Sequence, residues 1–458
     1  MSAGGDAAAA TGGATARGGL LGFWMCTALV VGNTIGIGIF VQPASLAPYG
    51  FNAFIAWAVT VVGCALLAVA FAMLARRLPE ADGPFGYMQA TLGEGLAFAA
   101  LWCYWISVWV SNAAIAVGVV GYLNVVVPPL AGIAPAVLAS VLIWLFVAVN
   151  LLGVRTGGGV QVVTTALKLT PMALVIVLGA WMLLVEPAAY TENLPTTPVT
   201  LPATLAASTI ALFAMLGLES ATIPAGKVRD PQRTIPRATL AGTLLTAAIY
   251  IAVTAVALLL VPQDTLAASG APFVEVLDRL IGAGNGRWLA LFVVISGAGA
   301  LNGWTLLAGQ LTRTLASRRL LPSPLARDNR RGAPAAALIV SGLLATAVAL
   351  MNYSRSLVEG FTFLSVIVTA ANLPLYVGCA AALVLLWRRD RSSLPRLAWL
   401  FGAGGFLYSV YAFVGVGTEP FLWALALAAV GLPLYLWRHL RSRQAAAGGA
   451  PSRPGTSA

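Results

Sequence analysis

The sequence predicts an all-α membrane protein with twelve transmembrane helices. Its composition is the first observation, since 59% of the residues are hydrophobic and only 9% are charged. So few charged groups cannot cover a soluble surface. The second observation is that apolar runs of about 18 or more residues recur along the chain. The third is that glycines interrupt the first and sixth runs, which indicates a site inside the membrane.

The predicted spans are separated by short loops punctuated by proline and glycine, such as Pro128-Pro129. No loop is long enough for a soluble domain. One membrane domain is therefore predicted over residues 19–440, between disordered cytoplasmic segments at 1–18 and 441–458. The spans are 19–43, 51–75, 95–123, 131–153, 159–185, 202–226, 238–262, 286–314, 335–353, 357–387, 397–416 and 419–438.

The basic residues predict that both termini are cytoplasmic. With the N-terminus inside, only Arg279, Arg287 and Arg355 of the 26 Lys and Arg residues fall outside, and Lys168 falls within a span. Cytoplasmic loops carry an excess of Lys and Arg, so this orientation is favoured. The net charge of +11 is then a topology signal of a multi-pass protein of the cell (inner) membrane, and no nucleic-acid partner is predicted.

The residues exclude several other chemistries. The four cysteines lie in apolar spans without CxxC spacing, and the only histidine, His439, follows the last span. No metal site, cofactor or ATP motif is predicted, so ion or substrate gradients must drive any transport. A channel would need rings of polar residues, and an intramembrane enzyme would need clustered carboxylates or metal ligands. Neither pattern is present.

The first span contains the sequence GNTIGIGIF at residues 32–40. Each of its three glycines weakens a helix by about 1 kcal/mol relative to alanine, so the helix should break there. A broken helix in hydrocarbon is tolerated where it lines a cavity or meets a ligand. The alternative is a close-packing GxxxG surface.

A second interruption lies in the sixth span, where Gly217 precedes Glu219. Ionisable residues at membrane depth mark sites by default, and the two candidates are Glu219 and Lys168 of the fifth span. Glu219 could instead pair with Lys227 or Arg229, but eight residues of helix span about 12 Å. Lys168 could snorkel to the cytoplasm. If its ammonium faces the interior, loss of water favours the neutral form, and Lys168 could exchange a proton.

The two interruptions lie five spans apart in helices of opposite direction. That spacing is expected of two five-helix units of inverted orientation whose interface holds the site. The predicted repeats cover about 19–185 and 202–387, with extra helices at 397–438. Other candidates for this interface are Tyr104, Ser107 and Asn112 on one face of the third span, Trp304 in the eighth and Tyr376 in the tenth. Any one of these could equally be a packing residue.

Several motifs together resemble the amino acid–polyamine–organocation superfamily, and most closely its bacterial basic amino acid/polyamine antiporters of the arginine/agmatine type. The resemblance covers residues 19–440. It rests on the first broken helix, PEADGPFGY at 79–87, GLES at 217–220 with DPQRTIP at 230–236, and GWTLLAGQ at 303–310.

This resemblance implies a five-plus-five inverted repeat of the LeuT type and a substrate site at its centre. The substrate carboxylate would meet the amides around Gly36 and Gly38. The ammonium would meet carbonyls near Asn33 to Ile35 and Phe213 to Met215. The resemblance assigns the side-chain pocket to Ser107, Val108, Asn112 and Trp304, and gating or pH sensing to Glu219 with Tyr104 and Tyr376.

The chain departs from that pattern at several positions. Ile37 replaces a small serine between the two glycines, and Phe213 replaces the tryptophan gate of the arginine exchanger. Val108 replaces a small residue near the side-chain pocket. Lys168 resembles a lysine that replaces sodium in sodium-independent relatives. The prediction is therefore a sodium-independent secondary active transporter, not an enzyme, that exchanges a cationic amino acid or polyamine or couples it to protons. The alternative is a proton-coupled symporter or exchanger of neutral amino acids. A homodimer is left open.

Overall fold

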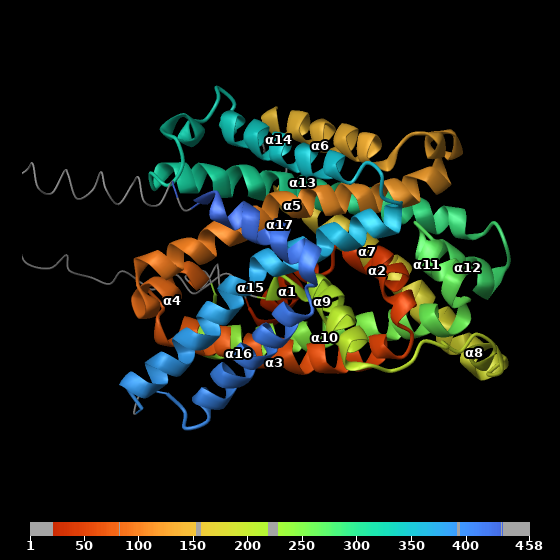
Figure 1. The fold of residues 1–458 in the computed structure, drawn as a ribbon, viewed down its shortest axis with the longest axis horizontal. Helices are drawn as coiled ribbons and strands as arrows, with labels where there is room; N and C mark the ends of the chain where they lie inside the picture. Colours follow the sequence, from red (N-terminus) through yellow and green to blue (C-terminus); the bar gives the residue numbers. More distant parts are fainter. Residues whose placement is uncertain are drawn as a thin grey trace, which may run out of the picture.

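The computed structural model describes residues 22–81, 83–152, 157–218, 228–391, 394–431 and 433, and the regular elements in these ranges are helices that run side by side (Figure 1). The helices at the predicted spans are α1 (Phe23–Thr34) with α2 (Gly38–Leu46), α3 (Asn52–Arg77), α5 (Glu94–Val126), α6 (Pro135–Leu151), α7 (Gly157–Val185), α9 (Leu201–Met215), α10 (Pro231–Leu260), α13 (Gly286–Ser317), α14 (Ala335–Met351), α15 (Leu357–Arg389), α16 (Ala398–Val414) and α17 (Thr418–Ala429). The predicted tails, 1–18 and 441–458, lie outside the described residues.

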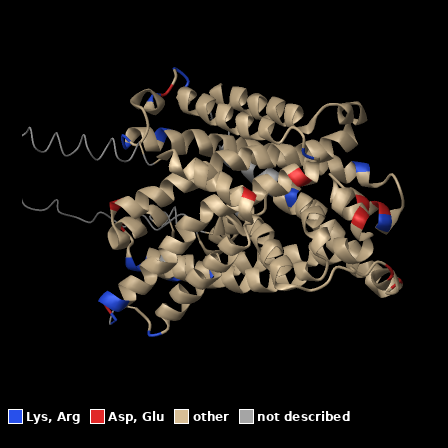
Figure 2. Cartoon of the chain, viewed as in Figure 1, with Lys and Arg blue, Asp and Glu red and all other residues tan. Residues whose placement is uncertain are grey.

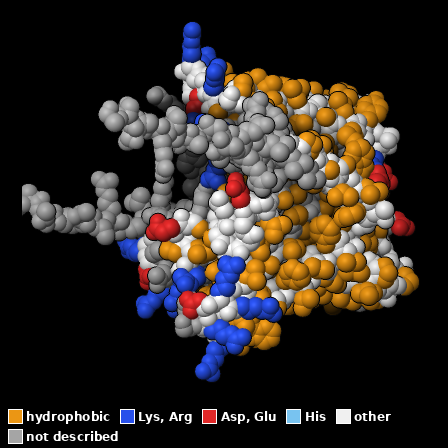
Figure 3. All heavy atoms as spheres, turned by 60° about the vertical axis from the view of Figure 1, so that its left-hand side comes forward, with side chains coloured by type: hydrophobic (Ala, Val, Ile, Leu, Met, Phe, Trp, Pro, Cys, Tyr) orange, Lys and Arg blue, Asp and Glu red, His pale blue; other side chains and the backbone are white. Residues whose placement is uncertain are grey.

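Six described helices are long and apolar enough to cross a membrane, namely α3, α5, α7, α10, α13 and α15. The pair α16 and α17, bent by 110°, would make a seventh if it forms one span. Helices α1, α6, α9 and α14 are apolar but shorter. A broad hydrophobic surface next to a zone of basic side chains (Figure 3) agrees with a multi-pass membrane protein.

Four short helices lie between the long ones: α4 (Gly83–Leu92), α8 (Ala189–Glu192), α11 (Gln263–Ala268) and α12 (Pro272–Ile281). The sequence pattern predicts loops at these four segments. Helix α12 is amphipathic and buries Phe273, Val276 and Leu277. Its exposed Arg279 pairs with Glu192 of α8 at 2.8 Å, a surface contact of less than about 1 kcal/mol.

The first span is interrupted, as predicted, and the helix of the sixth span ends where its interruption is predicted. Helix α1 ends at Thr34, Ile35 is extended with φ −75° and ψ 101°, and α2 begins at Gly38. Helix α9 ends at Met215. Gly217 then has φ +96°, in the left-handed region that glycine adopts without a steric penalty.

Side chains from neighbouring helices hold the broken segments in place. Gln42 of α2 donates its amide to the Ile210 carbonyl of α9 at 2.6 Å, and the Tyr122 hydroxyl of α5 donates to the Phe40 carbonyl at 2.6 Å. Ile37 packs closely against Gly118 and Gly297. If these glycines carried a Cβ atom, it would lie 3.2 Å from the Ile37 side chain at Gly118 and 3.0 Å from it at Gly297. The interruption is therefore a fixed part of the core.

Charged side chains gather at the two ends of the helix bundle (Figure 2). Lys and Arg predominate at the end that carries α4. The opposite end, with α8 and α12, carries most of the visible Asp and Glu. Between the two ends the cartoon of Figure 2 carries few charged residues, apart from a small group of acidic and basic residues near the middle of the view.

Candidate functional site

The two interrupted helices meet at a small internal cavity of about 40 Å³. Five parts of the chain contribute to its wall: the α1–α2 break, α5, the end of α9, α10 and α13. A cavity of this size has room for only a few waters, so it must widen to admit an amino acid. The lining residues are Thr34, Gly36, Ile37, Gly38, Ile39, Ser111, Ile115, Phe213, Ala214, Leu216, Tyr250 and Trp304.

One side of the cavity is formed by backbone hydrogen-bond donors. Helix α2 begins at Gly38, so the amides of Gly38 and Ile39 have no acceptors within the helix, whereas the Phe40 amide donates to the Ile37 carbonyl at 3.0 Å. The positive end of the helix dipole lies there. A Cβ on Gly36 would meet nothing within 4 Å, whereas one on Gly38 would lie 2.9 Å from Phe213 Cε1. This wall can receive a carboxylate.

Another part of the wall contains backbone acceptors at the ends of α1 and α9. The last carbonyls of a helix have no partner within it, and they form the negative end of the dipole. The Thr34 carbonyl accepts a hydrogen bond of 3.0 Å from the Tyr250 hydroxyl of α10. The remaining carbonyls around Ala214 and Leu216 can receive an ammonium group.

Tyr250 is a site residue that the sequence analysis missed. It is fully buried, and its ring lies edge-on to Trp57 of α3 at 5.7 Å. Trp57 in turn donates its indole N–H to Thr254 at 3.2 Å. The only sequence signal for Tyr250 is a hydroxyl-bearing ring in the middle of an apolar span, which resembles an ordinary packing residue.

We expect Tyr250→Phe to reduce both stability and exchange. The variant leaves the buried Thr34 carbonyl unpaired, at a cost of about 1–3 kcal/mol, and frees the end of α1 beside the cavity. Thermal melting and counterflow of the purified protein measure the two effects. Tyr190→Phe is the matched control, because its hydroxyl donates to the Gly179 carbonyl at 2.7 Å away from the cavity. Equal loss of exchange in both variants would contradict a positioning role for Tyr250.

Helix α5 presents Ser111 and Ile115 to the cavity, whereas the predicted contacts Ser107 and Val108 do not line it. The Ser107 hydroxyl donates to the Tyr104 carbonyl at 2.7 Å, and Ser111 donates to the Ser107 carbonyl at 2.7 Å. Ser111 is thus the hydroxyl of α5 that lies at the cavity.

Asn112 joins α5 to α13 beside the cavity. Its amide donates to the Val108 carbonyl at 3.2 Å and to the Trp304 carbonyl at 3.4 Å, and its Oδ1 accepts from Thr305 at 3.2 Å. Trp304 itself is half-buried and lines the cavity. Asn112 therefore fixes the segment that carries Trp304, and its own polar atoms are occupied by protein.

Four other predicted site residues, Ile35, Met215, Tyr104 and Tyr376, do not line the cavity. Ile35 and Met215 are buried but do not line it. Tyr104 is partly buried against the core, and Tyr376 is fully buried with its ring 5.6 Å from that of Phe71. Glu219 and the Asn33 side chain lie outside the described part of the structure.

Lys168 is only 5% exposed in α7. It carries an ammonium group well inside the protein, as the interior-facing alternative predicted. No group of three or more His, Cys, Asp or Glu side chains that could hold a metal ion occurs among the described residues. Lys168 does not line the cavity, so the described wall of the cavity offers the helix ends and neutral side chains.

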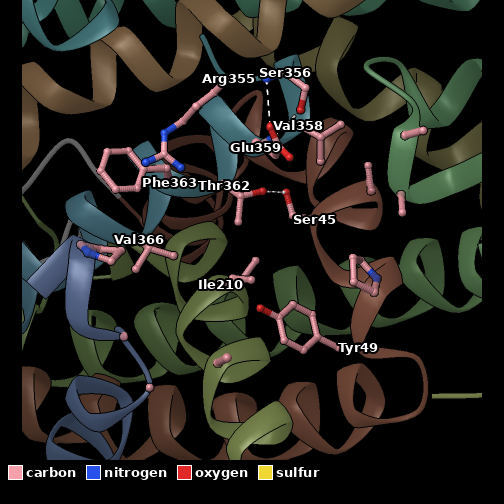
Figure 4. A pocket seen from close by; sticks show the side chains of 18 of the residues that line it. Ser45, Tyr49, Ile210, Arg355, Ser356, Val358, Glu359, Thr362, Phe363 and Val366 are labelled. Carbon is pink, nitrogen blue, oxygen red and sulfur yellow. Dashed lines mark hydrogen bonds between the residues drawn. The ribbon is translucent and has the colours of Figure 1, made fainter. Parts of the chain in front are cut away.

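A larger hollow, the vestibule, has a volume of about 780 Å³ and is lined by parts of α2, α9, α11 and α15 (Figure 4). It lies on the side of Arg355, which the sequence places outside. Arg355 bonds to Glu419 at 2.6 Å, and its guanidinium lies 4.1 Å from the Phe363 ring centroid. Deeper in the vestibule, Thr362 donates to Ser45 at 2.7 Å.

An aromatic pair connects the walls of the vestibule and the cavity. Ile210 lines the vestibule, and Phe213, three residues later on α9, lines the cavity. The Phe213 ring meets Phe361 of α15 edge-on, with centroids 5.7 Å apart. Phe361 adjoins Thr362 of the vestibule, so the Phe213–Phe361 contact links the linings of the two spaces.

Comparison with known proteins gives consistent matches over most of the chain. Residues 21–427 match the family of amino acid permeases. A cadaverine/lysine antiporter of Escherichia coli (strain K12) is 30% identical over 370 residues, which cover 78% of this chain and 82% of the relative. The putrescine transporter PotE of Haemophilus influenzae is 30% identical over 429 residues, or 92% of this chain and 97% of the relative.

A solved structure shares the fold at low identity. A Na+-coupled sialic acid symporter in a substrate-bound outward-open state has a TM-score of 0.51 and 13% identity, over 88% of this chain and 91% of that chain. At this identity the likeness concerns the fold alone.

Proposed function

Because the chain belongs to the amino acid permease family, we propose that it is a sodium-independent secondary active transporter that moves a cationic amino acid or polyamine by alternating access. The resemblance found in the sequence is confirmed at the family level, and the relatives are transporters and antiporters, not enzymes. Exchange against a related amine, or coupling to protons, supplies the driving force.

The observation that carries this proposal is the cavity between two interrupted helices. A zwitterion has an anionic and a cationic end, and the cavity offers amides at Gly36 and Gly38 and carbonyls at the ends of α1 and α9. Oppositely directed helix ends recognise both charges without an ionised side chain. Ser111, Phe213 and Trp304 then surround the substrate side chain.

The proposed topology has twelve spans with both termini cytoplasmic, in the inner membrane, built as a five-plus-five inverted repeat with two extra helices. The concentration of Lys and Arg at one end of the bundle supports this orientation (Figure 2). The vestibule then opens outward, and Phe213 acts as the gate between it and the cavity. The buried position of Lys168 in α7 supports sodium independence, because a protonated lysine there would take the place of a sodium ion.

Trp304 is the cavity residue best suited to favour a cationic side chain. We expect Trp304→Leu to weaken binding of lysine or putrescine by about 0.5–2 kcal/mol, the range of a cation–π contact, and to change alanine binding much less. Competition binding to the purified protein measures the difference. Trp181→Leu, at a ring that is 64% exposed on α7, is the control. An equal loss for lysine and alanine would indicate plain packing instead.

A second candidate function is transport of neutral amino acids. The apolar lining of the cavity favours it, because Ile37, Ile115 and Leu216 line the cavity. No carboxylate does so among the described residues. The two functions share the backbone site and differ only in the substrate side chain.

A counterflow panel with the purified protein in liposomes tests the proposed function. Arginine, agmatine, lysine, ornithine, cadaverine, putrescine and neutral amino acids are compared with and without sodium and with and without a proton gradient. The proposal expects sodium-independent exchange of at least one cation. Exchange of neutral amino acids alone would establish the second function, and no exchange of any compound would overturn both.

A further inference from the structure

Gln42 of α2 is a buried carboxamide with an unpaired oxygen. The residue is 0% exposed, and its Nε2 donates to the Ile210 carbonyl of α9 at 2.6 Å. Its Oε1 atom has no hydrogen-bond partner in the part of the chain that the structure describes. Buried polar atoms are ordinarily paired, and an unpaired one costs free energy, so this oxygen calls for an explanation.

Gln42 lies between the central cavity and the vestibule. On α2, Ile39 lines the cavity and Ser45 lines the vestibule, and Gln42 is three residues from each. At 1.5 Å per residue, each step is about 4.5 Å along the helix axis. On α9, Ile210 lines the vestibule and Phe213 lines the cavity, so the carbonyl that Gln42 contacts lies in the same layer. We call Gln42, Ile210 and Phe213 the partition.

The other two residues of the partition are apolar. Ile210 lies one turn before Phe213, whose ring meets that of Phe361 of α15 edge-on at 5.7 Å. An amino acid or polyamine that moves between the vestibule and the cavity carries at least one ammonium group past these side chains. The ammonium gives up part of its hydration there, which raises the free energy of passage. One acceptor oxygen in this layer would therefore have a large effect on the rate.

Ser45 continues the polar surface of α2 toward the vestibule. Residues three apart on a helix share a face, so Gln42 and Ser45 lie one above the other. The Ser45 hydroxyl accepts a hydrogen bond from Thr362 at 2.7 Å (Figure 4). A hydroxyl oxygen has two lone pairs, so it can accept a second bond. The two residues thus offer successive acceptors along one helix, from the vestibule inward.

A purely structural role does not require the unpaired oxygen. The Nε2 group of Gln42 links α2 to α9, but an apolar side chain of similar shape would pack in this layer without an unsatisfied acceptor. Replacing a buried polar group by an apolar group of the same shape is often neutral or stabilising. Polar side chains within membrane proteins are expensive and commonly mark the path of a substrate or ion.

We propose that Gln42 Oε1 accepts a hydrogen bond from the ammonium group of the substrate as it crosses the partition. This inference rests on the proposed transport function and adds a contact outside the central cavity. The helix ends hold the substrate at rest, whereas Gln42 stabilises it during passage. Gln42 therefore sets the rate of exchange and leaves the affinity of the cavity unchanged.

Gln42→Met tests the contact, because methionine keeps an unbranched side chain of similar length and removes the oxygen. Counterflow of labelled arginine, lysine, putrescine and alanine is measured in liposomes. We expect every compound that the unchanged protein exchanges to be exchanged about tenfold more slowly, since a hydrogen bond to a charged group is lost during passage. Equilibrium binding and the melting temperature should stay as they are. Gln42→Leu is measured alongside, in the event that the methionine variant does not fold.

The matched control is Asn352→Leu. Asn352 is also a buried carboxamide: its Nδ2 donates to the Val348 carbonyl at 2.8 Å, and its Oδ1 has no partner among the described residues. It follows the last residue of α14 and lines neither the cavity nor the vestibule. We expect Asn352→Leu to exchange at the full rate.

Gln42→Glu separates the acceptor from the amide group. Glutamate keeps an acceptor oxygen at this position, so it should exchange a cationic compound at least threefold faster than Gln42→Met. Equal rates in the two variants would overturn the inference, because the oxygen would then have no part in the passage.

The outcomes separate this inference from the transport proposal. If the unchanged protein exchanges a compound and Gln42→Met does so as fast as Asn352→Leu, the inference is overturned while the transport function stands. Slower exchange together with a lower melting temperature in Gln42→Met would identify a structural link between α2 and α9, which also overturns it. If the unchanged protein exchanges no compound, the transport proposal fails and this inference falls with it.

Discussion

Gly36→Val should fold normally and bind its amino acid substrate roughly ten- to hundred-fold more weakly. A Cβ at Gly36 meets nothing within 4 Å, so the added side chain enters the cavity and not the protein core. The cavity of about 40 Å³ has no spare room beside it. The methyl groups would block the amides at the start of α2. Loss of a hydrogen bond to a charged group costs about 1.5–3 kcal/mol, which gives the stated range of affinity.

Equilibrium binding and thermal melting of the purified variant measure this effect. Gly132→Val is the matched control, because a Cβ there also meets nothing within 4 Å but the residue lies in a loop turn far along the chain from the break. Binding by Gly36→Val at the affinity of the control would mean that the carboxylate does not approach these amides.

Lys168→Met should abolish accumulation driven by a proton gradient while some substrate binding remains. Methionine keeps much of the volume of the buried side chain but removes the ammonium group, which is 5% exposed in α7. If Lys168 takes the place of a sodium ion and carries the coupled proton, as proposed, both roles are then lost. Uptake into proteoliposomes at several external pH values measures the result.

Lys168→Arg separates the two roles of the charge. Arginine keeps a cation at this position but does not release its proton in proteins, so we expect binding to persist and the pH dependence of uptake to disappear. Uptake that retains its full pH dependence in both variants would refute a coupling role for Lys168. The coupled group would then have to be sought elsewhere, with Glu219 as the first candidate.

The positions of the long helices, the break between α1 and α2 and the end of α9 were predictable from the sequence. Hydrophobic runs locate membrane helices because the bilayer tolerates little else, and glycine is the residue that weakens them at the breaks. Short helices such as α12 were missed because their apolar faces are only a few residues long. Helix α12 interrupts a polar loop with just ten residues.

It was harder to predict from the sequence which side chains of α5 line the cavity. In the most apolar 18-residue stretch of this helix 94% of the residues are buried, so the hydrophobic pattern does not indicate which side faces the site. A rotation of one residue exchanges Ser107 for Ser111 or its neighbours. Tyr250 and Phe361 were missed for a similar reason, because aromatic residues in apolar spans are ordinarily packing residues.

A structure with bound substrate tests the central claim most directly, namely that a zwitterion completes the missing hydrogen bonds of two interrupted helices. The ligand is whichever compound the counterflow panel shows to be exchanged. If the ligand is an amino acid, we expect its carboxylate to lie about 2.7–3.2 Å from the amides of Gly36 and Gly38, and for any exchanged compound we expect an ammonium against the carbonyls that end α1 and α9. A substrate that makes no contact with either helix end would contradict the account.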